Sequence, residues 1–375
     1  MKRFVRVLLA CAGIALLAAC SSGSPKLRPA ELGPDPQKLA VQPLWSVRLG
    51  GEVAAQLQAR AGGSVLALAS TEGTVLALDA DKGGELWRAA VGAPLSAGVG
   101  FDGRWAAVVT RDNELVVLEA GRVLWRQRQP AQVHTAPLVA GARVFVLAAD
   151  RSVAAFDAQS GRRLWNQQRT GEALVLRQPG VLLPVGDTLV AGLSGRLVGL
   201  HPLTGGVRWE APLATPRGTN DIERLVDLVA PVSREADVIC ARAFQAAVGC
   251  VDAGRGAVLW TRPANGHRGV QGDAGHIYGV EADGTVLAWR RTDGERAWSQ
   301  DGLRYRGLGA PLLFDTTLML GDEAGLLHFV SARDGSLLAR VATDGTALAG
   351  APLRVGQAVV TVTRGGSVQA WRVAP

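Results

Sequence analysis

The sequence predicts an all-β fold, namely an eight-bladed β-propeller of four-stranded antiparallel blades whose ring is closed by an N-terminal strand. Three observations support this prediction: a unit ending in Trp recurs along the chain, 47 glycines and 18 prolines imply many turns, and no long segment has the apolar spacing of a helix. The length of 375 residues alone would also allow two or three separate domains. The repeat therefore favours a single ring of blades over separate domains.

The repeated unit is clearest in RSVAAFDAQSGRRLW, residues 151–165, which has an apolar strand, a turn with Asp and Gly, and a second strand ending in Trp. Copies of it start at residues 73, 113, 151, 195, 246, 284, 325 and 366. A period near 40 residues, with one longer interval of 51, is typical of four-stranded propeller blades. The eighth copy ends before its Trp, and an unmatched strand with Trp45 stands at residues 43–50. We expect this strand to complete the last blade.

The strands of each unit indicate how the blades pack. The middle strands are apolar at consecutive positions, which predicts that both of their faces are covered by neighbouring blades. We interpret the repeated Trp as a packing residue that fills the wide outer gap between blades, each ring contributing about 2–3 kcal/mol. It stands at residues 87, 125, 165, 209, 260 and 298, and Ala339 takes its place in the seventh unit.

The first 19 residues predict a lipoprotein signal peptide. A cationic start, MKRFVR, precedes a short apolar run from Val7 to Ala19 that is too short to span a membrane. The sequence LAAC at 17–20 resembles the lipobox of bacterial lipoproteins, which implies cleavage before Cys20 and attachment of diacylglycerol and a further acyl chain such as palmitate. The alternative is an ordinary signal peptide with a chance cysteine.

Residues 20–42 are expected to hold the lipidated Cys20 and a proline-rich tether, followed by a single propeller domain over 43–375. In an extended form the 22 residues after Cys20 reach about 70 Å. Ser21 is not the aspartate that retains many lipoproteins in the inner membrane. By analogy, we expect the chain at the periplasmic face of the outer membrane.

Composition argues against several functions. The net charge of +7 includes three cations of the signal peptide, the remaining arginines are scattered, and an exported chain does not meet nucleic acid. None of the five histidines stands in an HxxH or HExxH motif, and there is no CxxC, GxSxG or phosphate-binding glycine loop. We therefore expect no catalytic residue, no metal and no cofactor, and we expect His328 to be a hydrogen-bonded structural residue.

Two cysteines, Cys240 and Cys250, remain after signal cleavage and lipidation, in a compartment that allows disulfides. They lie in adjacent predicted strands. A three-residue loop at 244–246 places them opposite each other, whereas a two-residue turn places them on opposite faces. The sequence leaves a disulfide and two buried thiols equally open.

The Trp-bearing repeat is also similar to that of the quinoprotein (PQQ) dehydrogenases, which makes a PQQ-dependent periplasmic dehydrogenase the alternative function. Those enzymes carry a disulfide between adjacent cysteines, acidic calcium ligands and long insertions between blades. This chain has no Cys-Cys pair and no such insertions. An enzyme is therefore not the preferred hypothesis.

Departures from the period mark the candidate functional loops, because binding residues tend to lie on loops of a rigid scaffold. One departure is GEALVLRQPG at 171–180, and the other is EAPLATPRGTNDIERLVDLVAP at 210–231. The DIERLVDL part of the second stretch predicts a short helix with Asp221 as its N-cap.

The lipobox, the tether, the eight Trp-repeat blades and these two stretches together resemble the BamB family, the lipoproteins of the outer-membrane β-barrel assembly machinery. IERLVD at 222–227 resembles the family's I-[DE]-R-L-x-D motif, and LVLR at 174–177 resembles its L-x-L-R motif. Ala339 in the seventh Trp position is a further similarity. The resemblance covers the whole mature chain, with one departure: Val229 replaces the second acidic residue of the family's D-x-D pair, which implies a more apolar interface.

This resemblance implies a non-enzymatic scaffold that binds the POTRA domains of BamA, associates indirectly with other assembly lipoproteins and contacts nascent outer-membrane proteins. The implied partner-binding residues are Leu174 and Leu176 as apolar anchors, Arg177 as a bidentate donor, and Asp227 as the charge partner or orienter of Arg177. The alternative is that the leucines face the blade core and that Arg177 and Asp227 form a surface salt bridge of little energetic weight.

Overall fold

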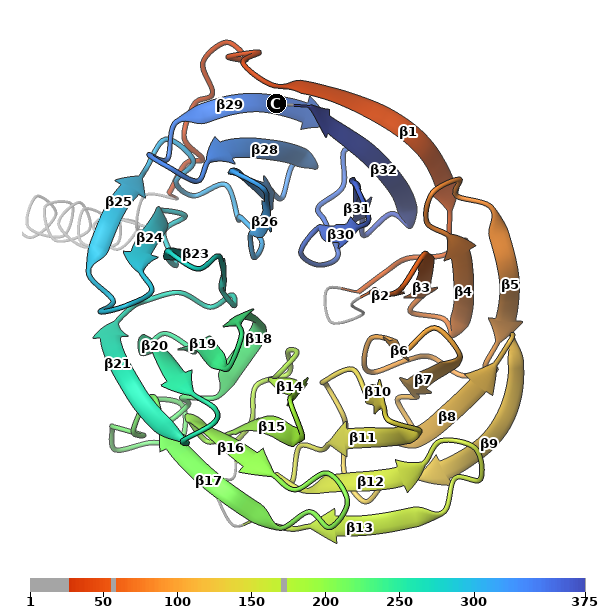
Figure 1. Ribbon diagram of the computed structural model, residues 1–375. Helices are drawn as coiled ribbons and strands as arrows, with labels where there is room; N and C mark the ends of the chain where they lie inside the picture. Colours follow the sequence, from red (N-terminus) through yellow and green to blue (C-terminus); the bar gives the residue numbers. More distant parts are fainter. Residues whose placement is uncertain (1–26, 55–58, 170–173, 375) are drawn as a thin grey trace, which may run out of the picture.

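The computed structural model describes residues 27–54, 59–169 and 174–374, which form a ring of eight four-stranded sheets around a central opening (Figure 1). Every regular element of these described residues is a β-strand. The described part of the chain also contains no helix with the length and apolarity needed to span a bilayer. The eight-bladed propeller predicted from the repeat is confirmed.

Each of the first seven blades is a meander of four consecutive antiparallel strands. Blade 1 comprises β2 (Arg60–Gly62), β3 (Val65–Ala69), β4 (Thr74–Asp79) and β5 (Glu85–Ala90), and blade 2 comprises β6 (Gly100–Phe101), β7 (Trp105–Val109), β8 (Glu114–Glu119) and β9 (Arg122–Arg128). Blade 3 comprises β10 (Leu138–Ala140), β11 (Arg143–Leu147), β12 (Val153–Asp157) and β13 (Arg163–Gln167), and blade 4 comprises β14 (Leu182–Val185), β15 (Thr188–Leu193), β16 (Arg196–Leu200) and β17 (Val207–Pro212). Blade 5 comprises β18 (Leu228–Glu235), β19 (Val238–Ala243), β20 (Ala247–Asp252) and β21 (Ala257–Pro263), and blade 6 comprises β22 (Gln271–Gly272), β23 (His276–Val280), β24 (Val286–Arg290) and β25 (Arg296–Gln300). Blade 7 comprises β26 (Leu312–Phe314), β27 (Thr317–Gly321), β28 (Leu326–Ser331) and β29 (Leu337–Ala342), and blade 8 comprises β30 (Leu353–Val355), β31 (Ala358–Val362), β32 (Ser367–Ala374) and β1 (Ala40–Arg48).

The eighth blade joins the two ends of the described chain. β1 pairs antiparallel with β32 from Ala40, opposite Ala374, to Arg48, opposite Ser367. One irregularity in the ladder lies between Pro43 and Trp45. The N-terminal strand therefore closes the ring as predicted, although it begins at Ala40 rather than at residue 43.

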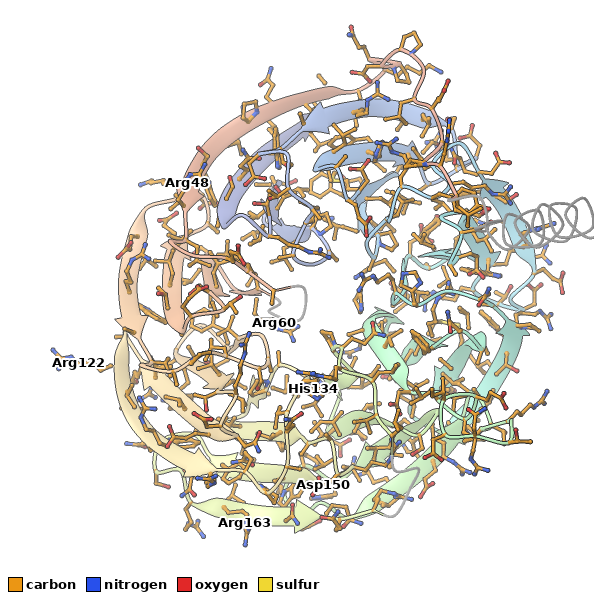
Figure 2. All side chains as sticks on the ribbon, turned by 180° about the vertical axis from the view of Figure 1, so that it is seen from behind. Arg48, Arg60, Arg122, His134, Asp150 and Arg163 are labelled. Carbon is orange, nitrogen blue, oxygen red and sulfur yellow. A yellow bond between two sulfur atoms is a disulfide. The ribbon has the colours of Figure 1, made fainter. Side chains whose placement is uncertain are left out.

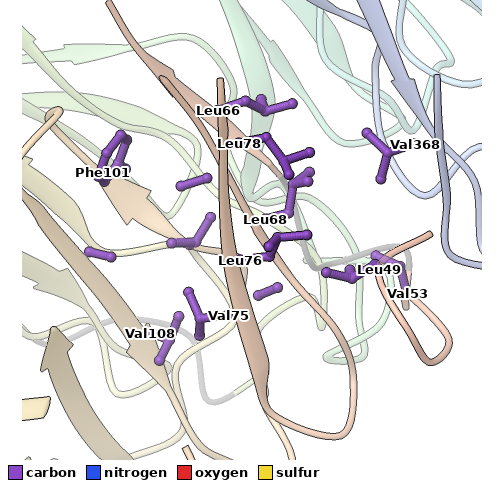
Figure 3. Close-up of a cluster of buried hydrophobic side chains, with 14 of the residues drawn as sticks. Leu49, Val53, Leu66, Leu68, Val75, Leu76, Leu78, Phe101, Val108 and Val368 are labelled. Carbon is purple, nitrogen blue, oxygen red and sulfur yellow. The ribbon is translucent and has the colours of Figure 1, made fainter. Parts of the chain in front are cut away.

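The hydrophobic core is divided among the spaces between adjacent blades. Leu76 and Leu78 of β4 are fully buried, and the cluster around them includes residues of blades 8 and 2 as well. Figure 3 shows these leucines near Val108 of β7 and Val368 of β32. Burying one such side chain contributes about 2 kcal/mol. Consecutive apolar positions are thus buried on both faces of a blade, as the sequence pattern predicted.

The Trp of each outer strand packs on a glycine of the next blade. The indole Nε1 of Trp125 donates a hydrogen bond to the carbonyl oxygen of Ala158 at 2.8 Å. A Cβ atom on Gly161, which has a φ of 71°, would lie 2.6 Å from the Trp125 ring. The Asp-x-x-x-Gly turn therefore needs glycine both for its left-handed backbone and for contact with the ring. The same pairing joins Trp45 to Gly83, Trp87 to Gly121, Trp165 to Gly205, Trp209 to Gly256, Trp260 to Gly294 and Trp298 to Gly335.

Ala339 occupies the Trp position of blade 7 because the next blade has no turn to receive a ring. The third and fourth strands of blade 8 are β32 and β1, which come from opposite ends of the described chain. No Asp-x-x-x-Gly turn joins them. Ala339 is instead buried in a cluster against which Leu39 and Val41 pack. The absence of Trp from blade 7 therefore follows from the way in which blade 8 is assembled from both ends of the described chain.

The segment before β1 lies along the ring instead of extending from it. The backbone N–H of Ala30 donates to the carbonyl of Arg304 at 2.9 Å, and that of Lys38 donates to Leu338 at 2.8 Å. Leu32 packs against the hydrophobic cluster between blades 6 and 7. The predicted 70 Å reach of the tether is therefore too long, because residues 30–38 are held by backbone hydrogen bonds and apolar contacts. Residues 1–26, including the signal peptide and Cys20, lie outside the described residues.

Candidate functional site

The two stretches that break the repeat lie on the same face of the ring. In each blade the second hairpin turn joins the second and third strands, and the crossover leads from the fourth strand to the next blade. Because the strands are antiparallel, this turn and the crossover lie at the same end of the sheet. We call this end of the ring the loop face. Residues 174–180 belong to the crossover from blade 3 to blade 4, and residues 213–227 form the crossover from blade 4 to blade 5. The two stretches meet where Gly180 forms an isolated antiparallel bridge with Val229.

A largely buried ion pair holds the stretches together. Arg151 Nη1 donates to Asp227 Oδ1 at 3.0 Å, and Arg151 Nη2 donates to the carbonyl oxygen of Leu174 at 3.0 Å. The other carboxylate oxygen of Asp227 accepts a bond from the backbone N–H of Leu176 at 3.0 Å. The side chains of Arg151 and Asp227 are 7% and 17% exposed, so water screens this pair much less than a surface pair. This clamp sets the position of residues 174–176.

Arg151 is a residue of the candidate site that sequence reasoning missed, although the repeat carries a signal for it. It stands in the turn between β11 and β12 with a φ of 65°. Most other blades have glycine at this position, for example Gly73 and Gly284. The left-handed region costs a residue with a side chain about 1 kcal/mol or more. An arginine in place of the repeated glycine therefore indicates that its side chain has a specific contact.

The clamp leaves an apolar and cationic surface exposed. Leu174 is 41% exposed, and Arg177 is also exposed, whereas Leu176 is half-buried and lines a small cavity of about 50 Å³ beside Asp227. The structure thus brings all four predicted site residues together. The expected pairing of Asp227 with Arg177 is not formed, and Asp227 instead accepts hydrogen bonds from Arg151 and from the backbone N–H of Leu176.

His134 lies next to this surface, at the inner margin of the ring (Figure 2). It lines the small cavity beside Asp227 and also a second cavity, which it shares with Arg177. Burial lowers the pKa of His134 below its ordinary value of 6.5, and the positive charge of Arg177 lowers it further. The imidazole is therefore neutral at pH 7 in the free protein.

Val229 does not contribute to the exposed surface. It is 1% exposed, and it pairs with Arg242 of β19 near the start of β18. The expectation that this residue makes the interface more apolar is wrong, because its side chain points into the protein. A valine at this buried position carries no charge, so it needs no ionic partner.

The second stretch forms a single turn instead of the predicted helix. Residues 221–224 are in turn conformation, and the backbone N–H of Arg224 donates to the carbonyl oxygen of Asn220 at 3.2 Å. The side chain of Asn220, not Asp221, caps this turn by accepting bonds from Ile222 and Glu223. One turn fixes many dihedral angles for few hydrogen bonds, so a helix does not propagate here.

Cys240 and Cys250 face each other across β19 and β20. The loop between these strands comprises residues 244–246, so the register places the two cysteines directly opposite. Their Cα atoms are 4.0 Å apart and their sulfur atoms form a disulfide bond. Of the two arrangements that the sequence left open, the three-residue loop selects the facing one. Both side chains are fully buried, which makes the bond part of the blade 5 core.

Within the described residues, no three His, Cys, Asp or Glu side chains are grouped so that they could hold a metal ion. His328 is 2% exposed, and its Nε2 lies 3.0 Å from Asp322 Oδ2. This contact agrees with the structural role expected for His328.

The fold and the site define a class of protein: an eight-bladed Trp-repeat propeller with a clamped apolar and cationic surface on its loop face. The chain belongs to the BamB family, because the family model described as outer membrane protein assembly factor BamB matches residues 71–300. The BamB protein of Burkholderia pseudomallei is 34% identical over 376 residues, which cover 99% of each chain. That of Bordetella pertussis is 32% identical over 362 residues, which cover 95% of this chain and 94% of the relative.

Solved structures show the same fold. The crystal structure of BamB from Moraxella catarrhalis has a TM-score of 0.81 at 23% identity and covers 89% of this chain and 100% of its own. A quinohemoprotein alcohol dehydrogenase from Comamonas testosteroni has a TM-score of 0.68 at 14% identity, over 88% of this chain and 76% of its own. At these identities the likeness concerns the fold alone.

Proposed function

We propose that this chain is a lipid-anchored, non-catalytic scaffold of the outer-membrane β-barrel assembly machinery. It docks on the POTRA domains of BamA and assists the folding and insertion of outer-membrane β-barrel proteins. Relatives named outer membrane protein assembly factor support the assembly role. The observation that carries the docking site is the clamp of Arg151 and Asp227, which unites two distant irregular stretches into one exposed surface.

The chemistry of this surface suits a protein partner. Leu174 provides an exposed apolar side chain that a partner can bury, and Arg177 provides a planar guanidinium that can bind a carboxylate in bidentate geometry. Asp227 acts as a positioning residue, since it holds the backbone at Leu176. Contacts with other assembly lipoproteins are indirect, through the same partner, and nascent barrel strands are further candidate ligands.

The anchoring part of the proposal rests on the N-terminal sequence. Residues 1–19 serve as the lipoprotein signal peptide, and acylation of Cys20 attaches the chain to the periplasmic face of the outer membrane. Residues 20–42 then link the lipid to the propeller domain. The LAAC sequence at 17–20 supports this assignment.

The quinoprotein alternative has no specific observation in its favour. The resemblance to the alcohol dehydrogenase does not extend beyond the fold, and the chain lacks the adjacent cysteine pair. We therefore retain a single candidate function.

The first prediction concerns the docking surface. Leu174→Asp should place a charge in the apolar contact, and Arg177→Glu should reverse the charge beside it. Each is expected to reduce the amount of BamA that co-purifies from solubilised envelopes by about tenfold or more.

Leu203→Asp serves as the matched control, because Leu203 is 55% exposed in the turn between β16 and β17, at the end of the blade opposite the loop face. This variant should retain BamA. Wild-type amounts of BamA with both loop-face variants would rule out the proposed docking surface.

A further inference from the structure

A second cavity, of about 300 Å³, adjoins the docking surface on the loop face. It is lined by Ser96, Arg111, Gln132, His134 and Arg177. Three successive crossovers and one hairpin turn supply these residues, and no carboxylate is among them. Two guanidinium groups therefore border a cavity without a counter-charge.

Several arginines on the outer strands form ion pairs. Arg88 contacts Glu85 at 2.8 Å, and Arg126 contacts Glu114 at 2.6 Å. Within the described part of the chain, the side chains of Arg111 and Arg177 make no hydrogen bond and no ion pair. Their guanidinium groups thus have all their donors available for a ligand.

The walls of this cavity are held by backbone contacts. The backbone N–H of Arg111 donates to Pro94 at 2.8 Å, which fixes the turn between β7 and β8 against the preceding crossover. Ser96 Oγ reaches the carbonyl oxygen of Val109 at 3.3 Å. The carbonyl oxygen of Gln132 accepts the N–H of Ala149 at 2.7 Å. Three neighbouring blades therefore preorganise the cavity before any ligand arrives.

We propose that this cavity is a subsite for an acidic side chain of the protein partner that docks on Leu174 and Arg177. The inference rests on the proposed function, because it assigns a chemical preference to the same docking surface. Arg177 lines the cavity and also ends the LVLR stretch, whose Leu174 is exposed, so one partner segment can cover both. An Asp or Glu carboxylate accepts hydrogen bonds from Arg111 and Arg177, while the amide of Gln132 supplies a further donor.

The experiment measures two quantities for each variant: the Kd for a fluorescein-labelled hexaglutamate peptide, by anisotropy, and the amount of co-purified BamA. Arg111→Gln is expected to raise the Kd and to lower BamA recovery by about tenfold, since one charge-assisted contact is lost. Arg111→Lys should fall between this variant and the wild type, because it keeps the charge but not the bidentate geometry.

Arg122→Gln is the matched control, because Figure 2 shows Arg122 at the outer rim, and the substitution removes the same charge. Its Kd for the peptide and its recovery of BamA should both stay within about twofold of the wild type. Equal effects of Arg111→Gln and Arg122→Gln would overturn the inference, as would binding of the wild type to anionic phosphatidylglycerol vesicles but not to the peptide. If Leu174→Asp lowers BamA recovery while Arg111→Gln does not, only the acidic subsite fails. If Leu174→Asp and Arg177→Glu both leave recovery unchanged, the proposed docking function itself fails, and the subsite with it.

Discussion

At the residue scale, Asp322 shows how one buried carboxylate connects distant parts of the chain. Its side chain is fully buried, and its Oδ2 lies 2.8 Å from Arg306 Nη2 and 3.0 Å from His328 Nε2. Arg306 Nη1 in turn donates to the carbonyl oxygen of Ala30 at 3.0 Å. Asp322 therefore stabilises blade 7 and also holds the arginine that fixes the N-terminal segment.

Asp322→Asn is expected to lower the free energy of unfolding by about 3 kcal/mol. An amide leaves the charge of Arg306 buried without its counter-ion, which is more costly than losing a surface pair. Urea unfolding of both proteins measures the difference. Limited proteolysis should also cut the variant faster near Ala30, because Arg306 loses its fixed position. Asp112→Asn, at an exposed turn position, should change neither result.

The pH dependence of this difference has a defined sign. Burial alone raises the pKa of Asp322, but hydrogen bonds from His328, from the backbone of Leu326 and from Arg306 bring it below its ordinary value of 3.8 overall. A pKa that is lower in the folded state contributes stability above its unfolded value, and this contribution is lost as the pH falls through the folded value. The gap between wild type and Asp322→Asn should thus be constant near neutral pH and shrink below about pH 4. A gap that grows on acidification would contradict this assignment.

At the scale of elements, every outer strand except that of blade 7 is joined to the next blade by a Trp ring on a glycine turn. This contact combines apolar burial with a hydrogen bond, as in Trp298, whose Nε1 donates to Ala332 at 3.0 Å. The contact needs a turn between the third and fourth strands of the receiving blade. Blade 8 has no such turn, and the small side chain of Ala339 lies in a cluster against which Leu39 and Val41 pack.

Ala339→Trp should therefore destabilise the protein, although it restores the repeat. A ring at this buried position has no glycine turn to pack on and displaces the segment around Leu39, which is expected to cost about 1–3 kcal/mol. Trp125→Ala should also destabilise, by about 3–5 kcal/mol, because it leaves a gap against Gly161. Thermal unfolding of Ala339→Trp and Trp125→Ala, compared with the wild type, tests both predictions. A higher Tm for Ala339→Trp would show that the absence of the turn does not explain the alanine.

At the scale of the whole molecule, stability depends on closure of the ring. β1 covers the edge of β32 over residues 40–48, and Trp45 packs on Gly83 of blade 1. Without this strand, blade 8 would expose an unpaired strand edge together with apolar surface. The ring also forms the proposed docking surface, because it brings crossovers of neighbouring blades to one face.

A chain that starts at residue 49 should therefore lose its monomeric state. We expect oligomers or aggregates in size-exclusion chromatography with light scattering, and a broadened thermal transition, because the β32 edge is free to pair. A chain that starts at residue 27 retains β1 and is the matched control. Monomers of the shorter chain with an unchanged transition would show that β1 is dispensable.

Local patterns predicted most of the architecture and part of the site. The Trp unit and the unmatched Trp45 strand were sufficient for eight blades and their closure, because each copy contains its own strands and turns. Breaks in the period located the two irregular stretches, and the resemblance to the BamB family pointed to Leu174 and Arg177 within the first of them. The helix with Asp221 as its cap was wrong, and the pairing of Asp227 with Arg177 was wrong as well. Both errors concern segments whose conformation depends on contacts with other blades.

The repeat, the number of blades and the loops that differ from the rest could be predicted from the sequence, since hydrophobic spacing and turn residues act over a few neighbouring positions. Three features became visible only in the folded protein: Arg151 pairs with Asp227, residues 30–38 lie along the ring, and Arg111 and Arg177 share one cavity. These contacts join residues far apart in the chain. Their partners are chosen by the geometry of the closed ring, which brings crossovers of different blades within hydrogen-bond distance.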